Sequence, residues 1–359
     1  MNALLLAEQM SAVQRVLTSG MYIGGSEVED FEQHWASKLG CAQFVGVGNG
    51  LDAIRILLES FGIGEGDEVI VPGFTYYATW LGVIQSGATP VAVDVDLRSA
   101  NLDPAAIEQA ITPRTKAVLV VHLFGRPAEM GEIRAVADRH SLLVFEDVAQ
   151  AHLQQTSSGF TGALSDGGAF SFYPTKNLGA AGDAGGISTS NSDAAARMRS
   201  RRSYGQGASK YDHVSLGWNS RLDPIQAALL NVSLPHLSEW TERRRQIAAS
   251  YLQALGDSEL AATAVGPRDV SGSVWHHFVL APADRDRFRS HMESSGIATD
   301  VHYPYSFNEL LPLERYRRSE IDIPNSVTLA HRVVSLPMGP WMTDSEVEQV
   351  MGALASYAS

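Results

Sequence analysis

Residues 168–188 read GAFSFYPTKNLGAAGDAGGIS and hold a single lysine, Lys176, among aromatic residues, hydroxyl residues and glycines. The nearest other lysines are Lys116 and Lys210, and Asp183 is the only acidic residue of the stretch. Glycines let the backbone come close to a bulky, flat ligand. A lysine used in amine chemistry must be partly desolvated, so that its neutral form is accessible. The stretch is therefore typical either of a reactive lysine or of an ordinary lysine in a glycine-rich surface loop.

Strands and helices alternate on the N-terminal side of this stretch. Apolar strands are predicted at 44–47, 68–71, 90–95, 116–123 and 142–146. Helices are predicted between them, and Asp103-Pro104 opens one that ends near Ile111. Near-continuous apolar strands indicate a mainly parallel α/β sheet with helices on both faces. Ligands of such sheets bind at the carboxyl ends of the strands, which here are 48–51, 72–77, 122–126 and 147–150.

The C-terminal third is expected to form a second, smaller domain. A long polar helix, roughly 236–255, leads into it. Strands are expected at 274–281 and near 297–301, and the last helix begins with a capping box of Thr343 and Glu346. We therefore expect a large domain over 1–240, with an N-terminal helical segment, and a small α+β domain over 241–359.

Composition limits the compartment and the partners. The 359 residues carry a net charge of −13 and no basic block, so nucleic acid is not expected as a partner. The single cysteine, Cys41, fits a reducing cytoplasm. No apolar run approaches the roughly 18 residues of a membrane span. The start, MNALLLAEQMSAVQRV, is expected to be a helix up to Ser19 and not a signal peptide. We expect a cytoplasmic protein without a membrane partner.

Candidate site residues follow several of the predicted strands. Asp147 ends one strand, where its carboxylate either pairs with a cationic ring nitrogen or caps a helix. The run 48–51, GNGL, offers free amides at a helix N-terminus, which suit a phosphate. Its glycine spacing is not the G-x-G-x-x-G of dinucleotide sites. Five further residues are either site residues or structural ones: Tyr76, Tyr77, His122 and the pair His302-Tyr303.

Together these features resemble the DegT/StrS-type sugar aminotransferases, which use pyridoxal 5′-phosphate (PLP) and have fold type I. The likeness runs from about Ser19 to Leu354. Its best parts are GVGNGLDA (46–53), GDEVIVPGFTYYAT (66–79), ITPRTKAVLVVHLFGRPAEM (111–130), FEDVAQAH (145–152), FSFYPTKNLGAAGDAGG (170–186), NSRLDPIQAALL (219–230) and GIATDVHYP (296–304). The FSFxPxKNLGAxGDxG run followed by NSRLDxxQAA is a specific pairing, and it favours the reactive lysine.

The resemblance implies a role for each residue around the cofactor ring. Lys176 would form the Schiff base with PLP, and Asp147 would pair with the protonated pyridine nitrogen and keep the ring an electron sink. Gln150 would lie by the phenolic oxygen of the ring. Tyr76 would stack on the ring face. No metal is implied.

The resemblance also implies how the phosphate is held. The amides of Gly50 and Leu51 and the hydroxyl of Ser171 would bind it. Asn219 would reach the phosphate in the partner subunit, so the active unit would be a homodimer that shares its active sites. Many relatives have Gly-Thr where this chain has Gly50-Leu51. One hydroxyl is therefore missing, and its function must pass to amides, Ser171, Asn219 or water.

For the substrates, the resemblance implies glutamate as amino donor and a nucleotide-linked keto sugar as acceptor, with Tyr173, His302 and Tyr303 near the sugar. The GNGLDA form is similar to the subgroup that acts on dTDP-linked 3-keto-6-deoxyhexoses. Some relatives carry histidine at the lysine position and are dehydratases, whereas Lys176 favours amino transfer. Four alternatives stay open: a 4-keto sugar, a cyclitol ketone, a dinucleotide-dependent oxidoreductase, and a PLP-binding regulator without turnover.

Overall fold

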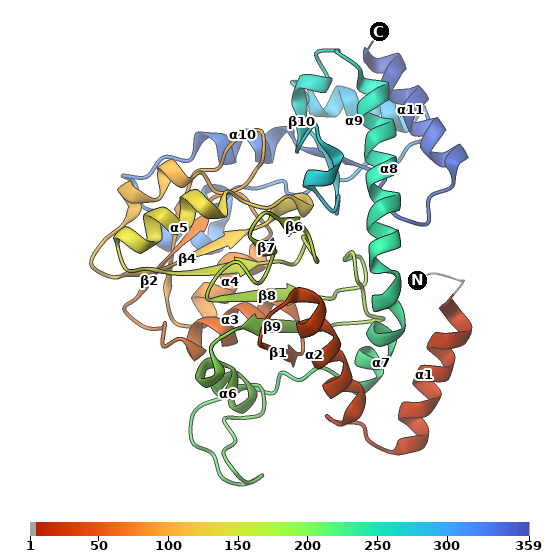
Figure 1. Ribbon diagram of the computed structural model, residues 1–359. Coiled ribbons are helices and arrows are strands. Elements are labelled where there is room, and N and C mark those ends of the chain that lie inside the picture. The colour runs from red at the N-terminus through yellow and green to blue at the C-terminus, as the bar shows by residue number, and fades with distance from the viewer. Residues whose placement is uncertain (1–4, 359) are drawn as a thin grey trace.

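A twisted seven-stranded sheet forms the centre of the structure, a computed structural model that describes residues 5–358 (Figure 1). The strand order is β1-β9-β8-β5-β4-β2-β3. The strands are β1 (Gln43–Val47), β2 (Glu68–Pro72), β3 (Thr89–Val93), β4 (Thr115–Val121), β5 (Leu143–Asp147), β8 (Gly167–Ser171) and β9 (Gly185–Thr189). Neighbouring strands from β8 to β3 are parallel, and only β9 runs antiparallel to its neighbours. The expected mainly parallel α/β sheet is confirmed.

Some of the helices cover both faces of this sheet, and others lie beyond it in the C-terminal third (Figure 1). They are α1 (Leu6–Ser19), α2 (Ser26–Leu39), α3 (Gly50–Ser60), α4 (Tyr77–Gln85), α5 (Met130–Arg139), α6 (Ser192–Arg201), α7 (Pro224–Ser233), α8 (Leu237–Leu255), α9 (Arg285–Ser294), α10 (Pro324–Arg332) and α11 (Asp344–Ala358). The first four residues of the expected N-terminal helix lie outside the described residues. The helix ends at Ser19, as expected, because Gly20 takes a left-handed conformation with φ of 70°. Within residues 5–358 no helix is both long and apolar enough to cross a membrane.

Continuous apolar strands make the centre of the sheet. Residues 69–71 of β2 and 117–120 of β4 are fully buried, because helices cover both faces there. Polar residues appear only where these strands end. Asp147 is the last residue of β5, so the sheet delivers its carboxylate to the carboxyl edge.

A second core lies in the C-terminal third. Helices α8, α9 and α11 pack around a three-stranded antiparallel sheet of β10 (Ala264–Val265), β11 (Phe278–Leu280) and β12 (Val334–Leu336). The predicted capping box of α11 is present, since Thr343 and Glu346 bond each other's backbone amides. The segment between these elements returns to the large core, where Phe307 packs edge-on against Trp80 at 5.4 Å. The division at residue 240 stays a prediction.

Three sequence expectations need correction. The helix expected after Asp103 consists of two 3₁₀ turns, Pro104–Ala106 and Glu108–Ala110. Its buried residues Ile107 and Ala110 are three apart, which matches the 3₁₀ repeat. The strand expected at 274–281 is only β11, because the backbone of 274–277 bonds to residues 124–125 of the large core instead. The strand expected near 297–301 is a single bridge between Asp300 and Ser335.

Four of the helices and strands had no counterpart in the sequence expectations. They are α6, α10, β10 and β12. A further short hairpin, β6 (Gln155–Thr156) with β7 (Gly159–Phe160), lies in the stretch 157–188 and just before it, where short strands and glycine turns were expected.

Candidate active site

Lys176 lies in a turn that follows β8 and is closed by backbone hydrogen bonds. The backbone of this turn is fixed, because the Lys176 amide donates to the Tyr173 carbonyl at 2.8 Å and Ala180 bonds back to Phe172. The Lys176 amine has no hydrogen bond or ion pair with any residue between 5 and 358. Burial lowers the pKa of Lys176 from 10.5 to about 8, and the nearby Asp147 carboxylate acts in the opposite direction. A neutral, unengaged amine is therefore available close to neutral pH.

Asp147 is the charge that faces this lysine. It is 7% exposed and accepts hydrogen bonds from the Thr79 hydroxyl at 2.8 Å and the Ala149 amide at 3.1 Å. Burial raises the pKa of Asp147, while these two hydrogen bonds and Lys176 lower it. Thr75 donates in turn to the Thr79 oxygen at 3.1 Å. Thr79 was not among the predicted site residues. Its spacing of four from Thr75, at the start of a helix beside the sheet edge, was the available signal.

Gln150 joins three separate segments. Its side-chain oxygen accepts from the Phe124 amide at 2.6 Å, and its side-chain nitrogen donates to the Tyr303 hydroxyl at 2.8 Å. The Tyr303 ring lies 5.2 Å from the Tyr76 ring, at a tilt of 40°. Burial raises the pKa of Tyr303, so its phenol stays protonated. The ring of Tyr76 is 56% exposed and offers a free aromatic surface beside Gln150.

An anion cradle forms where α3 begins. Asn49 caps the helix by accepting from the Asp52 amide at 2.8 Å. The amides of Gly50 and Leu51 donate to no acceptor in the described part of the chain. A Cβ on Gly50 would lie 2.7 Å from the Cβ of Ser171, so only glycine lets the helix start beside that hydroxyl. Free amides at a helix N-terminus, next to a hydroxyl, suit a phosphate.

Two buried histidines, His152 and His276, form hydrogen bonds with the turn that carries Lys176. His152 accepts from the Leu178 amide and donates to the Ser171 carbonyl at 3.0 Å, and burial lowers its pKa to about 3. Asn177, the neighbour of Lys176, accepts from His276 at 2.9 Å and donates to the Val274 carbonyl. These residues fix the turn without supplying charge. His276 was not predicted, because it comes from a distant segment.

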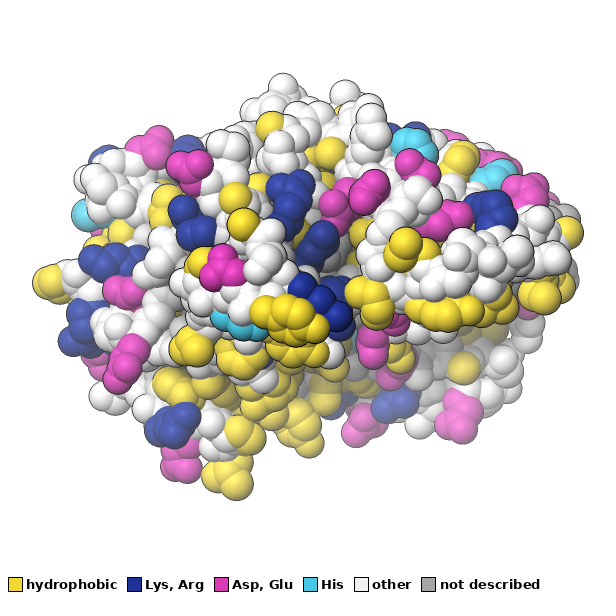
Figure 2. Space-filling model, turned by 90° about the horizontal axis from the view of Figure 1, so that it is seen from below, with side chains coloured by type: hydrophobic (Ala, Val, Ile, Leu, Met, Phe, Trp, Pro, Cys, Tyr) yellow, Lys and Arg dark blue, Asp and Glu magenta, His cyan; other side chains and the backbone are white. Residues whose placement is uncertain are grey.

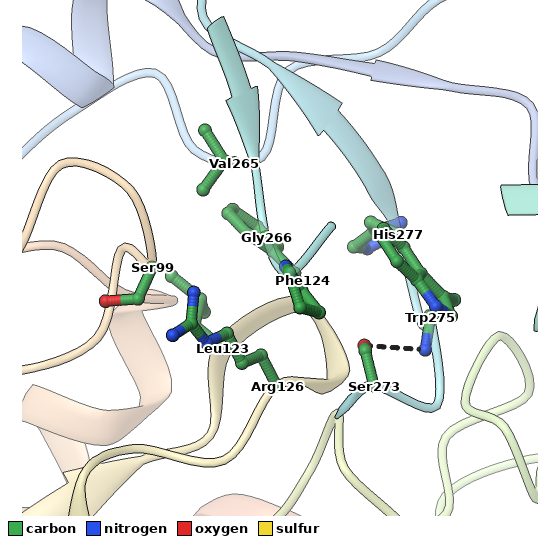
Figure 3. Close-up of a pocket in the computed structure, with 10 residues that line it drawn as sticks. Ser99, Leu123, Phe124, Arg126, Val265, Gly266, Ser273, Trp275 and His277 are labelled. Atoms are coloured by element: carbon green, nitrogen blue, oxygen red, sulfur yellow. Dashed lines mark hydrogen bonds between the residues drawn. The ribbon is translucent and has the colours of Figure 1, made fainter. Parts of the chain in front are cut away.

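Figure 3 shows where this distant segment meets the large core. Phe124 and Arg126 face Val265, Gly266 and His277 across a narrow pocket. The amides of Val274 and His276 donate to the carbonyls of residues 125 and 124. None of the residues predicted to bind PLP lines this pocket. It is a contact between the two cores, and it fixes the Phe124 amide that holds Gln150.

Some candidates have other partners. His122 is fully buried, accepts from the Ala128 amide and donates to Glu146 at 2.8 Å, so it is structural. His302 stacks on His277 with ring centres 3.9 Å apart and bonds Ser335 at 2.9 Å. Tyr77 packs against the large core. The side chains of Tyr173 and Asn219 point outward and are exposed.

Taken together, the site offers an amine with a lowered pKa, a buried carboxylate, an open aromatic ring and an anion cradle. The residues fit PLP, whose aldehyde reacts with amines, whose ring nitrogen is cationic and whose phosphate needs amides and hydroxyls. Two observations support the phosphate end of this fit: the unbonded amides of Gly50 and Leu51, and the close approach of Ser171, which leaves no room for a Cβ at Gly50.

Comparisons with known proteins agree with this chemistry. A sequence model described as the DegT/DnrJ/EryC1/StrS aminotransferase family matches residues 5–355. The chain is 43% identical to the dTDP-3-amino-3,4,6-trideoxy-alpha-D-glucose transaminase of Streptomyces venezuelae, over 99% of this chain and 93% of that protein. It is 42% identical to the dTDP-3-amino-3,6-dideoxy-alpha-D-galactopyranose transaminase of Aneurinibacillus thermoaerophilus, over 98% and 95%. The solved structure of DesV from S. venezuelae superposes with a TM-score of 0.94 at 43% identity, over 99% of this chain and 95% of that one.

Proposed function

Because the chain belongs to the DegT/DnrJ/EryC1/StrS aminotransferase family, we propose that it transfers the amino group of glutamate to a dTDP-linked 3-keto-6-deoxyhexose. It is a PLP-dependent aminotransferase. The observation that carries the proposal is the unengaged amine of Lys176, whose pKa burial lowers to about 8 opposite the buried Asp147. Two relatives that are more than 40% identical are named for dTDP-linked 3-amino sugars, which supports the 3-keto acceptor.

Lys176 and Asp147 are assigned the catalytic roles. When bound, PLP supplies an electron sink for the charge that develops as a proton leaves the α-carbon of the amino donor. The neutral Nζ of Lys176 accepts that proton, since its lowered pKa keeps part of the amine neutral. Asp147 would pair with the cationic ring nitrogen, which would keep its carboxylate ionised, and Thr79 holds that carboxylate in place. In the full reaction, glutamate and the keto sugar would be converted into 2-oxoglutarate and the amino sugar, and Lys176 would return the proton in the second half of the reaction.

Further residues are assigned to hold the cofactor. Tyr76 would support the face of the ring, and Gln150, whose amide group is oriented by Phe124, would bind near its phenolic oxygen. The amides of Gly50 and Leu51 and the Ser171 hydroxyl bind the phosphate. Leu51 supplies no hydroxyl, so this cradle relies on backbone amides more than that of relatives with threonine.

We propose a homodimer in which Asn219 of each chain reaches the phosphate bound by the partner. The side chain of Asn219 is exposed and forms no hydrogen bond with any described residue of its own chain. Residues near it in sequence, including Tyr211 and Leu216, expose apolar side chains that a second chain would cover. With its single cysteine, such a dimer suits a reducing cytoplasm.

Tyr173, Tyr303 and His302 are assigned to the sugar side. Tyr173 and Tyr76 both expose more than half of their side chains, and Tyr303 packs against Tyr76. The paired rings of Tyr76 and Tyr303 offer an apolar surface with hydroxyl tips, which suits a deoxysugar. His302 contributes indirectly, because its ring is held by His277 and Ser335.

Substrate comparison with matched controls tests this function. Purified enzyme is mixed with glutamate and either a dTDP-linked 3-keto-6-deoxyhexose, its 4-keto isomer or a cyclitol ketone, and the aminated product is measured by mass spectrometry. We expect turnover with the 3-keto sugar and none in Lys176→Ala. Preference for the 4-keto sugar or the cyclitol ketone would replace the acceptor. Normal turnover by Lys176→Ala would remove the lysine from the mechanism.

A further inference from the structure

An extended arm, residues 203–219, follows α6 and projects below the sheet (Figure 1). Its base is closed by backbone hydrogen bonds, from the Tyr204 amide to the Trp218 carbonyl at 2.8 Å and from the Trp218 amide to the Arg201 carbonyl at 2.6 Å. The arm exposes Tyr211 and Leu216 at 84% and 88%. Figure 2 looks onto this lower end of the molecule and shows hydrophobic side chains gathered on it. The two backbone hydrogen bonds fix the position of Trp218 at the end of the arm, next to Asn219.

Trp218 is clamped on α3. The Arg55 guanidinium lies over its ring, 3.7 Å from the ring centre, and its indole N–H donates to the Glu59 carboxylate at 3.0 Å. Arg55 and Glu59 are one helical turn apart, so a single face of α3 holds both the ring and the N–H of the tryptophan. Arg55 is held in turn by Asp52 at 2.7 Å. The indole thus has one defined orientation relative to α3.

Ser220, on the other side of Asn219, is fixed to the loop before the same helix. The Gly48 amide donates to the Ser220 hydroxyl at 3.0 Å. Asn219 therefore lies between two anchors, Trp218 on α3 and Ser220 on Gly48, while its own side chain has no partner in the described chain. A polar side chain that is exposed and unpaired, on a backbone that is fixed at both sides, is prepared to bind something outside its own chain.

We propose that Trp218 is a positioning residue that acts in trans: by its clamp on α3, it orients Asn219 toward the phosphate in the partner subunit. This rests on the proposed function, in which Asn219 crosses the dimer interface. Helix α3 then serves two sites. Its N-terminal amides, at Gly50 and Leu51, hold the phosphate of its own chain. Its face with Arg55 and Glu59 holds Trp218, and through Trp218 it orients Asn219 toward the phosphate of the partner subunit.

Hybrid dimers separate an effect in trans from an effect in cis. Two differently tagged chains are co-expressed and purified through both tags. In the first hybrid one chain carries Lys176→Ala and the other carries Trp218→Ala. Its only Lys176 site receives Asn219 from the chain whose Trp218 is intact. In the second hybrid one chain is wild type and the other carries both substitutions, so the only Lys176 site receives Asn219 from the arm that lacks Trp218.

The readout is equilibrium PLP binding, followed by the visible absorbance of PLP bonded to Lys176. We expect the first hybrid to bind PLP as tightly as the wild-type dimer. We expect the second hybrid and the Trp218→Ala homodimer to bind it about 10-fold more weakly or worse, the loss typical of a hydrogen bond to a charged group. The reverse pattern would show that Trp218 acts on its own chain and would overturn the proposal. Equal binding by both hybrids would overturn it as well.

Companion variants keep the test decisive. The same two hybrids made with Asn219→Ala must give the same pattern, and a different pattern would show that Trp218 does not act through Asn219. Trp218→Phe keeps the ring over Arg55 and loses the bond to Glu59, so it should give a smaller loss, and it replaces Trp218→Ala if that variant does not fold. A monomeric wild-type protein would also overturn the proposal. Because only PLP binding is measured, failure to aminate a dTDP sugar would leave this result unchanged.

Discussion

The protonation of Lys176 gives the sharpest quantitative expectation. Burial lowers its pKa from 10.5 to about 8. At pH 7 a lysine with a pKa of about 8 is roughly 10% neutral, whereas a lysine at 10.5 is neutral in roughly one molecule in 3,000. The site therefore holds about 300 times more neutral amine than an exposed lysine at the same pH. Only the neutral amine attacks an aldehyde, so the rate of PLP capture by the apoenzyme should follow this fraction.

The assay is stopped-flow absorbance of PLP capture as a function of pH, with borohydride trapping and peptide mass spectrometry to confirm the bond at Lys176. We expect the rate to rise with pH and to level off above about 8. Asp147 raises the pKa of Lys176, so Asp147→Asn should move the midpoint to lower pH. The exposed Lys116 provides the control, since Lys116→Ala should leave the curve unchanged. A wild-type midpoint near 10.5, or a midpoint raised by Asp147→Asn, would refute the reasoning.

Three further substitutions have expected outcomes. Thr79→Val removes a hydroxyl that donates to Asp147 at 2.8 Å, so the half-reaction with glutamate should slow by about 10-fold or more, while thermal unfolding changes little. An unchanged rate would show that the carboxylate needs no such support. Leu51→Thr restores a hydroxyl beside the Gly50 amide and should tighten PLP binding by about 2- to 10-fold in an absorbance titration. Weaker binding would place that side chain away from the phosphate. His122→Ala removes one of the donors to the buried Glu146 and leaves the buried Ala128 amide without its acceptor, so it should lower the free energy of unfolding by about 2–3 kcal/mol, with no change in the spectrum of bound PLP. A spectral change would return His122 to the active site.

The core of the site could be predicted because its residues stand at strand ends. Asp147 ends β5, Gly50 begins α3 directly after the strand β1 and its turn, and Ser171 ends β8. In a parallel sheet these ends share one edge, so a periodic pattern of apolar runs already brings the residues together. The Lys176 turn departs from that pattern, and its glycines and lone amine identified it as the part of the chain that reacts.

The supporting residues could not be predicted, because their role depends on contacts between distant segments. The sequence 274–281 predicts a single strand, yet residues 274–277 bond to the backbone of 124–125 and not to a strand. His276 reaches Asn177 only because of that docking. The stacking of His302 on His277 likewise joins two distant segments, and the placing of His302 near the sugar stays a prediction. Periodicity carries no information on such pairings, since each depends on where a second core lies.

The pKa of Lys176 is lowered and that of Asp147 is raised, and both shifts have the same physical origin. This origin explains why the site without the cofactor is electrostatically unfavourable. Asp147 is buried and Lys176 is partly buried, so the charged form of each is disfavoured, and no hydrogen bond or ion pair joins them directly in the described chain. Their mutual attraction offsets only part of this penalty. A ligand with a cationic ring nitrogen returns the lost stabilisation to Asp147, and a covalent bond to its aldehyde removes the free ammonium of Lys176. The site is therefore electrostatically incomplete alone, and the group that completes it is the one whose phosphate fits the two free amides of α3.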